Sequence, residues 1–132
     1  WSEEFLKCLS LKLIPGGRLI TYCRAAAIRG SLRRSGLNLH SLAPNPADER
    51  SWSNGTLAIL SETGQSKGTK STHWKPLSTM EEDHLLTRAA IPYRDPSGND
   101  TREQILYRRK KEQQMCQLES TSTWQKRWKK VQ

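Results

Sequence analysis

Two clusters of basic side chains near the C-terminal end of the sequence are the residues best suited to chemistry, and that chemistry is phosphate binding. The first cluster is the unbroken run Arg108, Arg109, Lys110 and Lys111. The second surrounds two tryptophans, Trp124 and Trp128, and consists of Lys126, Arg127, Lys129 and Lys130. Basic side chains that neutralise phosphates release counterions, so these clusters favour salt-dependent binding of nucleic acid. The tryptophans, one helical turn apart, could stack on bases.

The charge of this region has a second explanation. Residues 102–132 hold nine Lys or Arg and three Glu, a net charge of +6, within a chain whose formal net charge is +9. A basic helix face that only meets solvent, with both tryptophans docked on the rest of the chain, would give the same pattern. The sequence leaves both interpretations open: nucleic-acid binding or a solvated face.

The sequence contains no catalytic or metal-binding constellation. Cys8, Cys23 and Cys116 are odd in number and widely spaced, so they form neither a disulfide framework nor a CxxC metal pair. None of the three histidines has a second candidate ligand three or four residues further on, and we predict no metal site. The Pro15-Gly16-Gly17 segment follows a predicted helix and precedes a predicted strand. A nucleotide loop needs the opposite order, so this segment is predicted to be a turn.

Composition limits the fold to about one domain with a modest core. Leu, Ile, Val and Phe make 24 of the 132 residues, below the roughly 20% at which a highly charged chain struggles to bury a core. No apolar stretch approaches the roughly 18 residues of a membrane-spanning helix, so we predict no membrane association. The sequence opens at Trp1 without a basic segment followed by an apolar one, so no signal peptide is predicted.

Residues 1–61 carry most of the regular apolar pattern and predict an α/β domain. The expected elements are helix, strand, helix, strand and strand, at residues 2–13, 18–23, 25–35, 37–42 and 56–60. The second helix would cross over between two strands that form a parallel pair, and the last strand would lie antiparallel because a loop without a helix precedes it. Two helices cannot cover both faces of such a sheet. We therefore expect about three strands that make half of a sheet, with a bare face or edge.

The second predicted helix is amphipathic. Its buried side is predicted to consist of Ala25, Ala26, Ile28 and Leu32, and its solvent side of Arg29, Arg33 and Arg34. Gly36 is expected just beyond its C-terminal end, where glycine is favoured.

The rest of the chain divides into a linker and an extension. Residues 62–76 are rich in Gly, Ser, Thr and Lys and predict a flexible linker. Residues 77–132 form a polar, basic and helix-favouring extension. Ser78 and Glu81 have capping-box spacing, which predicts a helix over 79–90. Asp100 is the predicted cap of a further helix over 101–118.

A resemblance to a known family rests on four segments of the first 36 residues. They are Trp1, then Pro15-Gly16-Gly17, then "TYCRAAAIR" at 21–29, and then Leu32 and Gly36. This pattern resembles the MnmC-like methyltransferases of tRNA wobble-uridine modification, a branch of the class I, S-adenosylmethionine-dependent enzymes. The tail from "PLSTMEEDHLLTRAAIPYRDP" to "STSTWQKRW" is similar to the C-terminal extension of the stand-alone members.

The resemblance implies the C-terminal half of a Rossmann-like methyltransferase sheet from a cytoplasmic enzyme. The family transfers a methyl group from S-adenosylmethionine to the aminomethyl group of the wobble uridine. Its cofactor-binding strands and acidic catalytic residue would lie upstream of Trp1, so this chain is expected to be inactive alone and not to bind the cofactor. The alternative is a small basic nucleic-acid-binding module without catalytic activity. A third interpretation is a chain that never folds stably.

By position in the family pattern, Thr21 and Tyr22 would end a strand at the rim of the cofactor pocket. Arg29 would meet a phosphate or an acidic partner, or else form a structural ion pair. One departure is clear: bifunctional members carry a basic "GRKRE" run before the last strand, and Asn54-Gly55-Thr56 stands there in this chain. Any RNA contact made by that run does not carry over.

Overall fold

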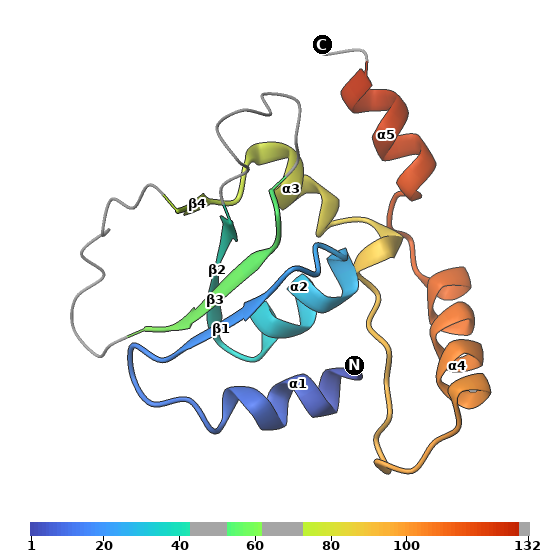
Figure 1. Cartoon of the computed structure of the whole chain (residues 1–132). Helices are drawn as coiled ribbons and strands as arrows, with labels where there is room; N and C mark the ends of the chain where they lie inside the picture. The colour runs from blue at the N-terminus through green and yellow to red at the C-terminus, as the bar shows by residue number, and fades with distance from the viewer. Residues whose placement is uncertain (43–52, 62–72, 130–132) are drawn as a thin grey trace.

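The computed structural model describes residues 1–42, 53–61 and 73–129. Its sheet has four strands in the order β1-β3-β2-β4, and each neighbouring pair is antiparallel. The strands are β1 (Arg18–Thr21), β2 (Leu37–Leu42), β3 (Thr56–Leu60) and β4 (Trp74–Pro76). β1 and β4 are therefore the edge strands (Figure 1).

The predicted parallel pair is wrong. β1 and β2 run in the same direction, because each is antiparallel to β3, but β3 lies between them and takes the backbone hydrogen bonds of both. The physical reason lies in β3 itself. Its first three residues, Thr56 to Ala58, are all buried, as expected of a central strand covered on both faces. The predicted antiparallel direction of this last strand is confirmed.

A glycine allows β3 to begin tightly against the end of β1. A Cβ atom added to Gly55 would lie 2.3 Å from the carbonyl oxygen of Thr21 and 2.8 Å from the Cα of Tyr22. Neither contact can relax through a flexible side chain, because both atoms belong to the backbone. The Asn54-Gly55 pair thus closes the sheet at this corner.

Both predicted helices of the first 61 residues are present and slightly shorter than expected. In α1 (Glu3–Ser10), the Ser2 hydroxyl accepts a hydrogen bond from the Phe5 amide at 3.2 Å and caps the helix. After α2 (Ala26–Arg34), Gly36 has φ +85°, the left-handed conformation expected just past a helix end. The core joins α1, α2, the sheet and the segment before α3, through Leu6, Ile28, Leu32, Leu37, Leu39, Ala58 and Leu77.

The segment predicted as a linker and the tail both contribute structure that the sequence did not predict. β4 lies inside the range 62–76, whose residues 62–72 fall outside the described part of the chain. The capping box of Ser78 and Glu81 is present, but α3 (Thr79–His84) is shorter than predicted, and the 3₁₀ turn η1 (Arg88–Ala90) follows it. The division of the chain into 1–61, 62–76 and 77–132 stays a prediction.

The tail then runs along α1 before its last two helices. The Glu3 amide donates to the Tyr93 carbonyl at 2.7 Å, which ties residue 93 to the start of α1. α4 (Arg102–Met115) is capped by Thr101 and not by Asp100, whose carboxylate pairs with Arg108 instead. α5 (Thr121–Lys129) follows, and both helices lie to one side of the sheet (Figure 1).

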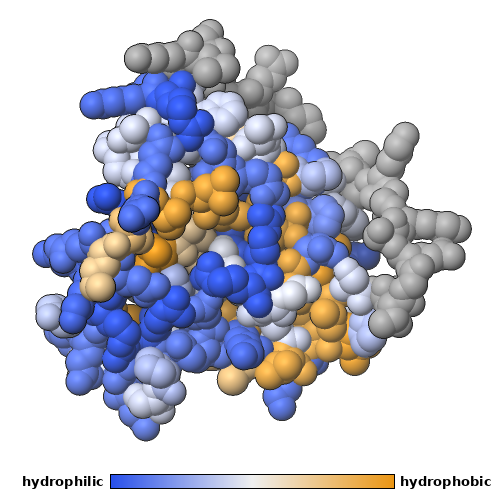
Figure 2. Space-filling model, turned by 180° about the vertical axis from the view of Figure 1, so that it is seen from behind, coloured by the Kyte–Doolittle hydropathy of each residue, from blue (hydrophilic) through white to orange (hydrophobic). Residues whose placement is uncertain are grey.

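Apolar side chains remain exposed around α1 and β1. Ile20 on the edge strand β1 is 65% exposed and Tyr22, just after it, is 89% exposed. Apolar and hydrophilic patches alternate on the face shown in Figure 2. None of the described helices is long and apolar enough to cross a membrane.

Candidate nucleic-acid interface

Arg29 is buried inside the molecule, so the predicted solvent exposure of this side chain is wrong. Its Nη1 atom pairs with Glu81 at 2.9 Å, its Nε atom donates to the Thr56 hydroxyl at 2.7 Å, and its Nη2 atom donates to the Ser53 hydroxyl at 2.9 Å. Each guanidinium nitrogen thus serves an internal contact. This is the structural ion pair named above as the alternative to a phosphate contact.

Glu81 receives a dense set of hydrogen bonds at the centre of the same network. Its carboxylate accepts from the hydroxyls of Ser41, Ser53 and Ser78 and from the Ser78 amide, at distances of 2.7–2.9 Å. Burial alone would raise the pKa of the Glu81 carboxyl, but these hydrogen bonds and Arg29 outweigh it and lower the pKa to about 2. Glu81 is therefore ionised in the folded chain above about pH 2, and it joins α3 to β2 and α2.

The two other predicted pocket-rim residues differ in exposure. Thr21 is buried, and its hydroxyl accepts a hydrogen bond from the Cys23 amide at 3.1 Å. Tyr22, next to it, projects into solvent. Both stand where β1 ends. Their role at a pocket rim stays a prediction.

The four basic residues of α4 divide into two pairs. Arg108 pairs with Asp100 at 2.9 Å, and Arg109 donates to the carbonyls of Ile91 and Ala89 while its guanidinium lies 4.4 Å from the centre of the Tyr93 ring. These arginines attach α4 to the segment before it. Lys110 and Lys111 are exposed and make no hydrogen bond or ion pair to described residues. They are the members of the run that remain available to a phosphate.

The basic residues of α5 divide in the same way. Arg127 pairs with Asp83 at 2.6 Å and with Glu119 at 2.7 Å, whereas Lys126 and Lys129 are exposed and unpaired among the described residues. Lys130 lies outside the described part of the chain.

Both tryptophans of α5 dock on the protein. Trp124 is buried, and its ring stacks on His84 with 4.4 Å between ring centres; the Trp128 indole nitrogen donates to Asp83 at 2.6 Å. Burial of His84, with Arg29 nearby, lowers the pKa of its imidazole. Docking, and not base stacking, accounts for Trp124.

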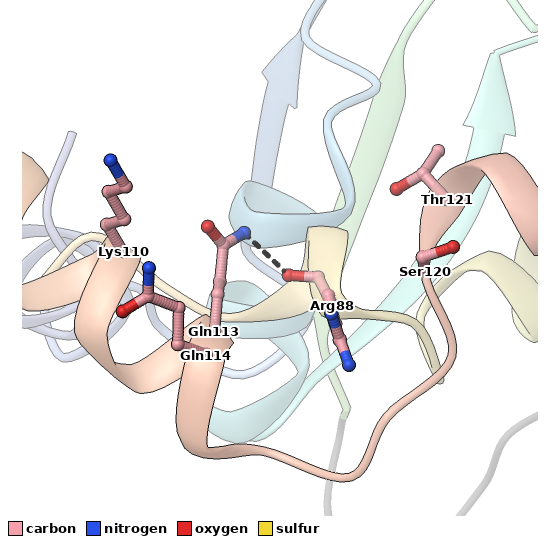
Figure 3. Close-up of a pocket in the computed structure, with 6 residues that line it drawn as sticks. All are labelled: Arg88, Lys110, Gln113, Gln114, Ser120 and Thr121. Carbon is pink, nitrogen blue, oxygen red and sulfur yellow. Dashed lines mark hydrogen bonds between the residues drawn. The ribbon is translucent and has the colours of Figure 1, made fainter.

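An open hollow separates α4 from the start of α5. It has a volume of about 270 Å³. Its lining consists of Arg88, Lys110, Gln113, Gln114, Ser120 and Thr121. Figure 3 shows Lys110, Gln113 and Gln114 on the α4 side, Ser120 and Thr121 on the α5 side, and the Gln113 amide reaching the Arg88 carbonyl. We call this site the α4–α5 hollow.

The sequence analysis did not identify the contacts of two residues in this region, Glu81 and Arg88. The sequence identified Glu81 only as a helix cap, although a carboxylate three residues after Ser78 is also placed to meet a buried cation. Arg88 lies alone among apolar and small residues, without the charge clustering that marks the other basic residues. No group of three potential metal ligands occurs among the described side chains.

Comparison with known proteins relates this fold to a solved structure. No family model and no curated protein matches the sequence. The structure of MnmC2 from Aquifex aeolicus is similar, with a TM-score of 0.63 and 21% sequence identity over 83% of this chain. At that identity the likeness shows the fold alone, an arrangement of helices and a β-sheet. The matched region makes up 32% of the Aquifex chain, so this chain spans about a third of its length.

Proposed function

We propose that this chain is the C-terminal portion of an S-adenosylmethionine-dependent methyltransferase that acts in tRNA wobble-uridine modification, of the 5-methylaminomethyl-2-thiouridine type. The observation that carries the proposal is the structural likeness to MnmC2 over 83% of the chain. The "TYCRAAAIR" segment, by which the sequence resembles the same family, lies inside the β1–α2 unit of this fold. In this proposal the protein works in the cytoplasm with tRNA as its substrate.

Among the described residues, the glycine turn does not form a cradle for S-adenosylmethionine. The glycine turn follows α1 and precedes β1, and its backbone is already used: the Gly16 amide donates to the Leu60 carbonyl at 2.8 Å, and the Leu60 amide donates to the Gly17 carbonyl at 3.0 Å. These contacts extend the pairing of β1 with β3. In the proposed enzyme the cofactor is therefore held by the other part of a longer chain, with Thr21 and Tyr22 at the rim.

Calorimetry with S-adenosylmethionine tests this proposal. We expect no heat of binding for the 132-residue chain, and binding by a chimera in which this chain replaces the matching third of the Aquifex MnmC2. Intact MnmC2 is the positive control, and circular dichroism checks that the chimera is folded. Binding or tRNA methylation by the 132-residue chain alone would contradict the proposal, as would a folded chimera that does not bind the cofactor.

A second candidate function is RNA binding without catalysis, which the unpaired lysines of α4 and α5 favour. We expect the triple variant K111A/K126A/K129A to bind tRNA more weakly and with a shallower salt dependence. Each lost phosphate contact should reduce the slope of log K against log salt by about 0.7–0.9. Filter binding or fluorescence anisotropy at two salt concentrations measures both effects.

The matched control removes three other exposed lysines whose side chains make no hydrogen bond or ion pair to the described residues. K7A/K12A/K75A changes the net charge equally, on α1, its C-terminal side and β4. Equal loss of affinity in both triple variants would mean that net charge attracts the RNA and that α4 and α5 form no interface.

A further inference from the structure

The lining of the α4–α5 hollow consists only of residues with hydrogen-bond donors. Arg88 and Lys110 supply positive charge, Gln113 and Gln114 supply amides, and two hydroxyls complete the set. No carboxylate lines the hollow. Most of the surface inside the hollow belongs to carbon atoms of these side chains, so an anion there would be bound by the donor groups at the ends of the side chains.

Arg88 is held in place before any ligand arrives. Its amide donates to the Glu119 carbonyl, its carbonyl accepts from the Gln113 side chain, and its Nε atom donates to the Leu118 carbonyl, each at 2.9 Å. A guanidinium is planar, so fixing Nε also fixes the directions of Nη1 and Nη2. These two nitrogens make no hydrogen bond to the described residues, and together they match two oxygens of one phosphate.

The acidic side chains nearest in sequence to the hollow are already paired. The Glu119 carboxylate is held by Arg127 at 2.7 Å, and the Glu112 carboxylate is held by Arg94 at 2.9 Å. Lys110 makes no ion pair among the described residues, so the positive charge of the lining is not neutralised within this part of the protein.

We propose that the α4–α5 hollow binds one phosphodiester group of an RNA backbone. Arg88 meets two phosphate oxygens through Nη1 and Nη2, and the glutamine amides of α4 add hydrogen bonds. Lys110, whose ammonium group points away from the Arg88 guanidinium in Figure 3, adds positive charge beside the bound phosphate. The hollow is open, which a polymer requires, because the chain must leave a bound phosphate on both sides. The exposed lysines beyond the hollow, Lys111 and Lys126, continue the positive surface for flanking phosphates. This proposal rests on the RNA-binding function proposed above.

Nuclear magnetic resonance of the labelled full chain locates the bound group. We expect a uridine trinucleotide to shift the side-chain amide signals of Gln113 and Gln114, and to leave those of Gln104 and Gln125, on the same two helices, unchanged. Inorganic phosphate, titrated separately, should need a higher concentration. Equal effects of phosphate and trinucleotide would overturn the assignment to an RNA backbone, and unshifted Gln113 and Gln114 signals would overturn the site.

Two single variants test which groups hold the phosphate. K110A should weaken tRNA binding about 3- to 10-fold and reduce the salt slope by about 0.7–0.9. R88K keeps the positive charge but removes the planar guanidinium with its two Nη donors. It should therefore weaken tRNA binding by a similar factor and leave the salt slope unchanged. K75A, an exposed lysine on β4, is the control, and circular dichroism checks the fold of each variant.

The outcomes separate this proposal from the one on which it rests. If K110A and R88K bind tRNA as tightly as K75A while K111A/K126A/K129A binds weakly, the hollow is not a phosphate site and the RNA-binding function stands. If none of these variants binds more weakly than its control, both proposals fail.

Discussion

Replacing Glu81 with glutamine should lower the free energy of unfolding by about 3–5 kcal/mol, because it leaves the Arg29 guanidinium buried without its counter-charge. Both side chains are almost completely buried, at 2% and 5% exposure. The net stability of a domain is only about 5–15 kcal/mol, so the loss would bring the chain close to unfolding at room temperature. Urea denaturation followed by circular dichroism measures it.

The matched control is Glu82→Gln, one residue further along α3. Glu82 pairs with Arg33 on the surface, where the two side chains are 46% and 42% exposed, and surface pairs of this kind contribute about 0–1 kcal/mol. A double variant, Arg29→Met with Glu81→Leu, should be more stable than Glu81→Gln, since no buried charge is left unpaired. If Glu81→Gln and Glu82→Gln lower the stability equally, the buried network does not hold the fold together.

The same carboxylate should make the folded chain sensitive to acid. The unfolded chain takes up a proton on Glu81 near the ordinary pKa of 4.5, whereas the folded chain keeps Glu81 ionised until about pH 2. Between these values the unfolded state binds more protons. The contribution of Glu81 is therefore complete above about pH 4.5 and is lost as the pH falls toward 2. Denaturation curves across this range should show a shallower acid dependence in Glu81→Gln than in the unchanged chain.

The elements that could be predicted are those whose signals are local. Ser2 caps α1 and Gly36 follows α2, and the bounds of β2 and β3 match the apolar runs. Strand order is not a local property. The sequence places β3 after a loop, and only its burial on both faces, from Thr56 to Ala58, marks it as a central strand. β4 is three residues long and has no apolar alternation to predict it.

The prediction that Arg29 is exposed to solvent was wrong for a similar reason, because it rested on a local pattern. An arginine on an amphipathic helix is normally exposed, and Arg29 is buried only because Glu81, 52 residues later, neutralises it. Helix geometry also divides the basic run of α4. Successive residues turn by about 100° around a helix, so four consecutive side chains cannot face one surface. Arg108 and Arg109 consequently attach α4 to the chain before it, and Lys110 and Lys111 face solvent.

Replacing Trp124 with alanine should release α5 from the rest of the protein without unfolding the sheet. Removing a buried tryptophan side chain costs about 3–5 kcal/mol, and few other contacts attach this helix: the Trp128 indole and Arg127 both bind Asp83 of α3, and Arg127 also pairs with Glu119. Amide hydrogen exchange should show rapid exchange in α5 and unchanged protection in β2 and β3. Trp1→Ala, a change at a side chain that is 62% exposed, is the control.

The release of α5 should also change the titration of His84, the side chain on which Trp124 stacks. Burial lowers the pKa of His84 in the intact chain, so its pKa should rise toward the ordinary value of 6.5 in Trp124→Ala. Because Ser120 and Thr121 form the α5 side of the hollow, tRNA binding should weaken together with the loss of protection in α5. A variant whose α5 amides stay protected, or whose His84 titrates as in the unchanged chain, would contradict this prediction. If α5 is released as expected, Trp124 serves RNA binding only indirectly, because its ring holds the basic surface of α5 in place and does not stack on a base.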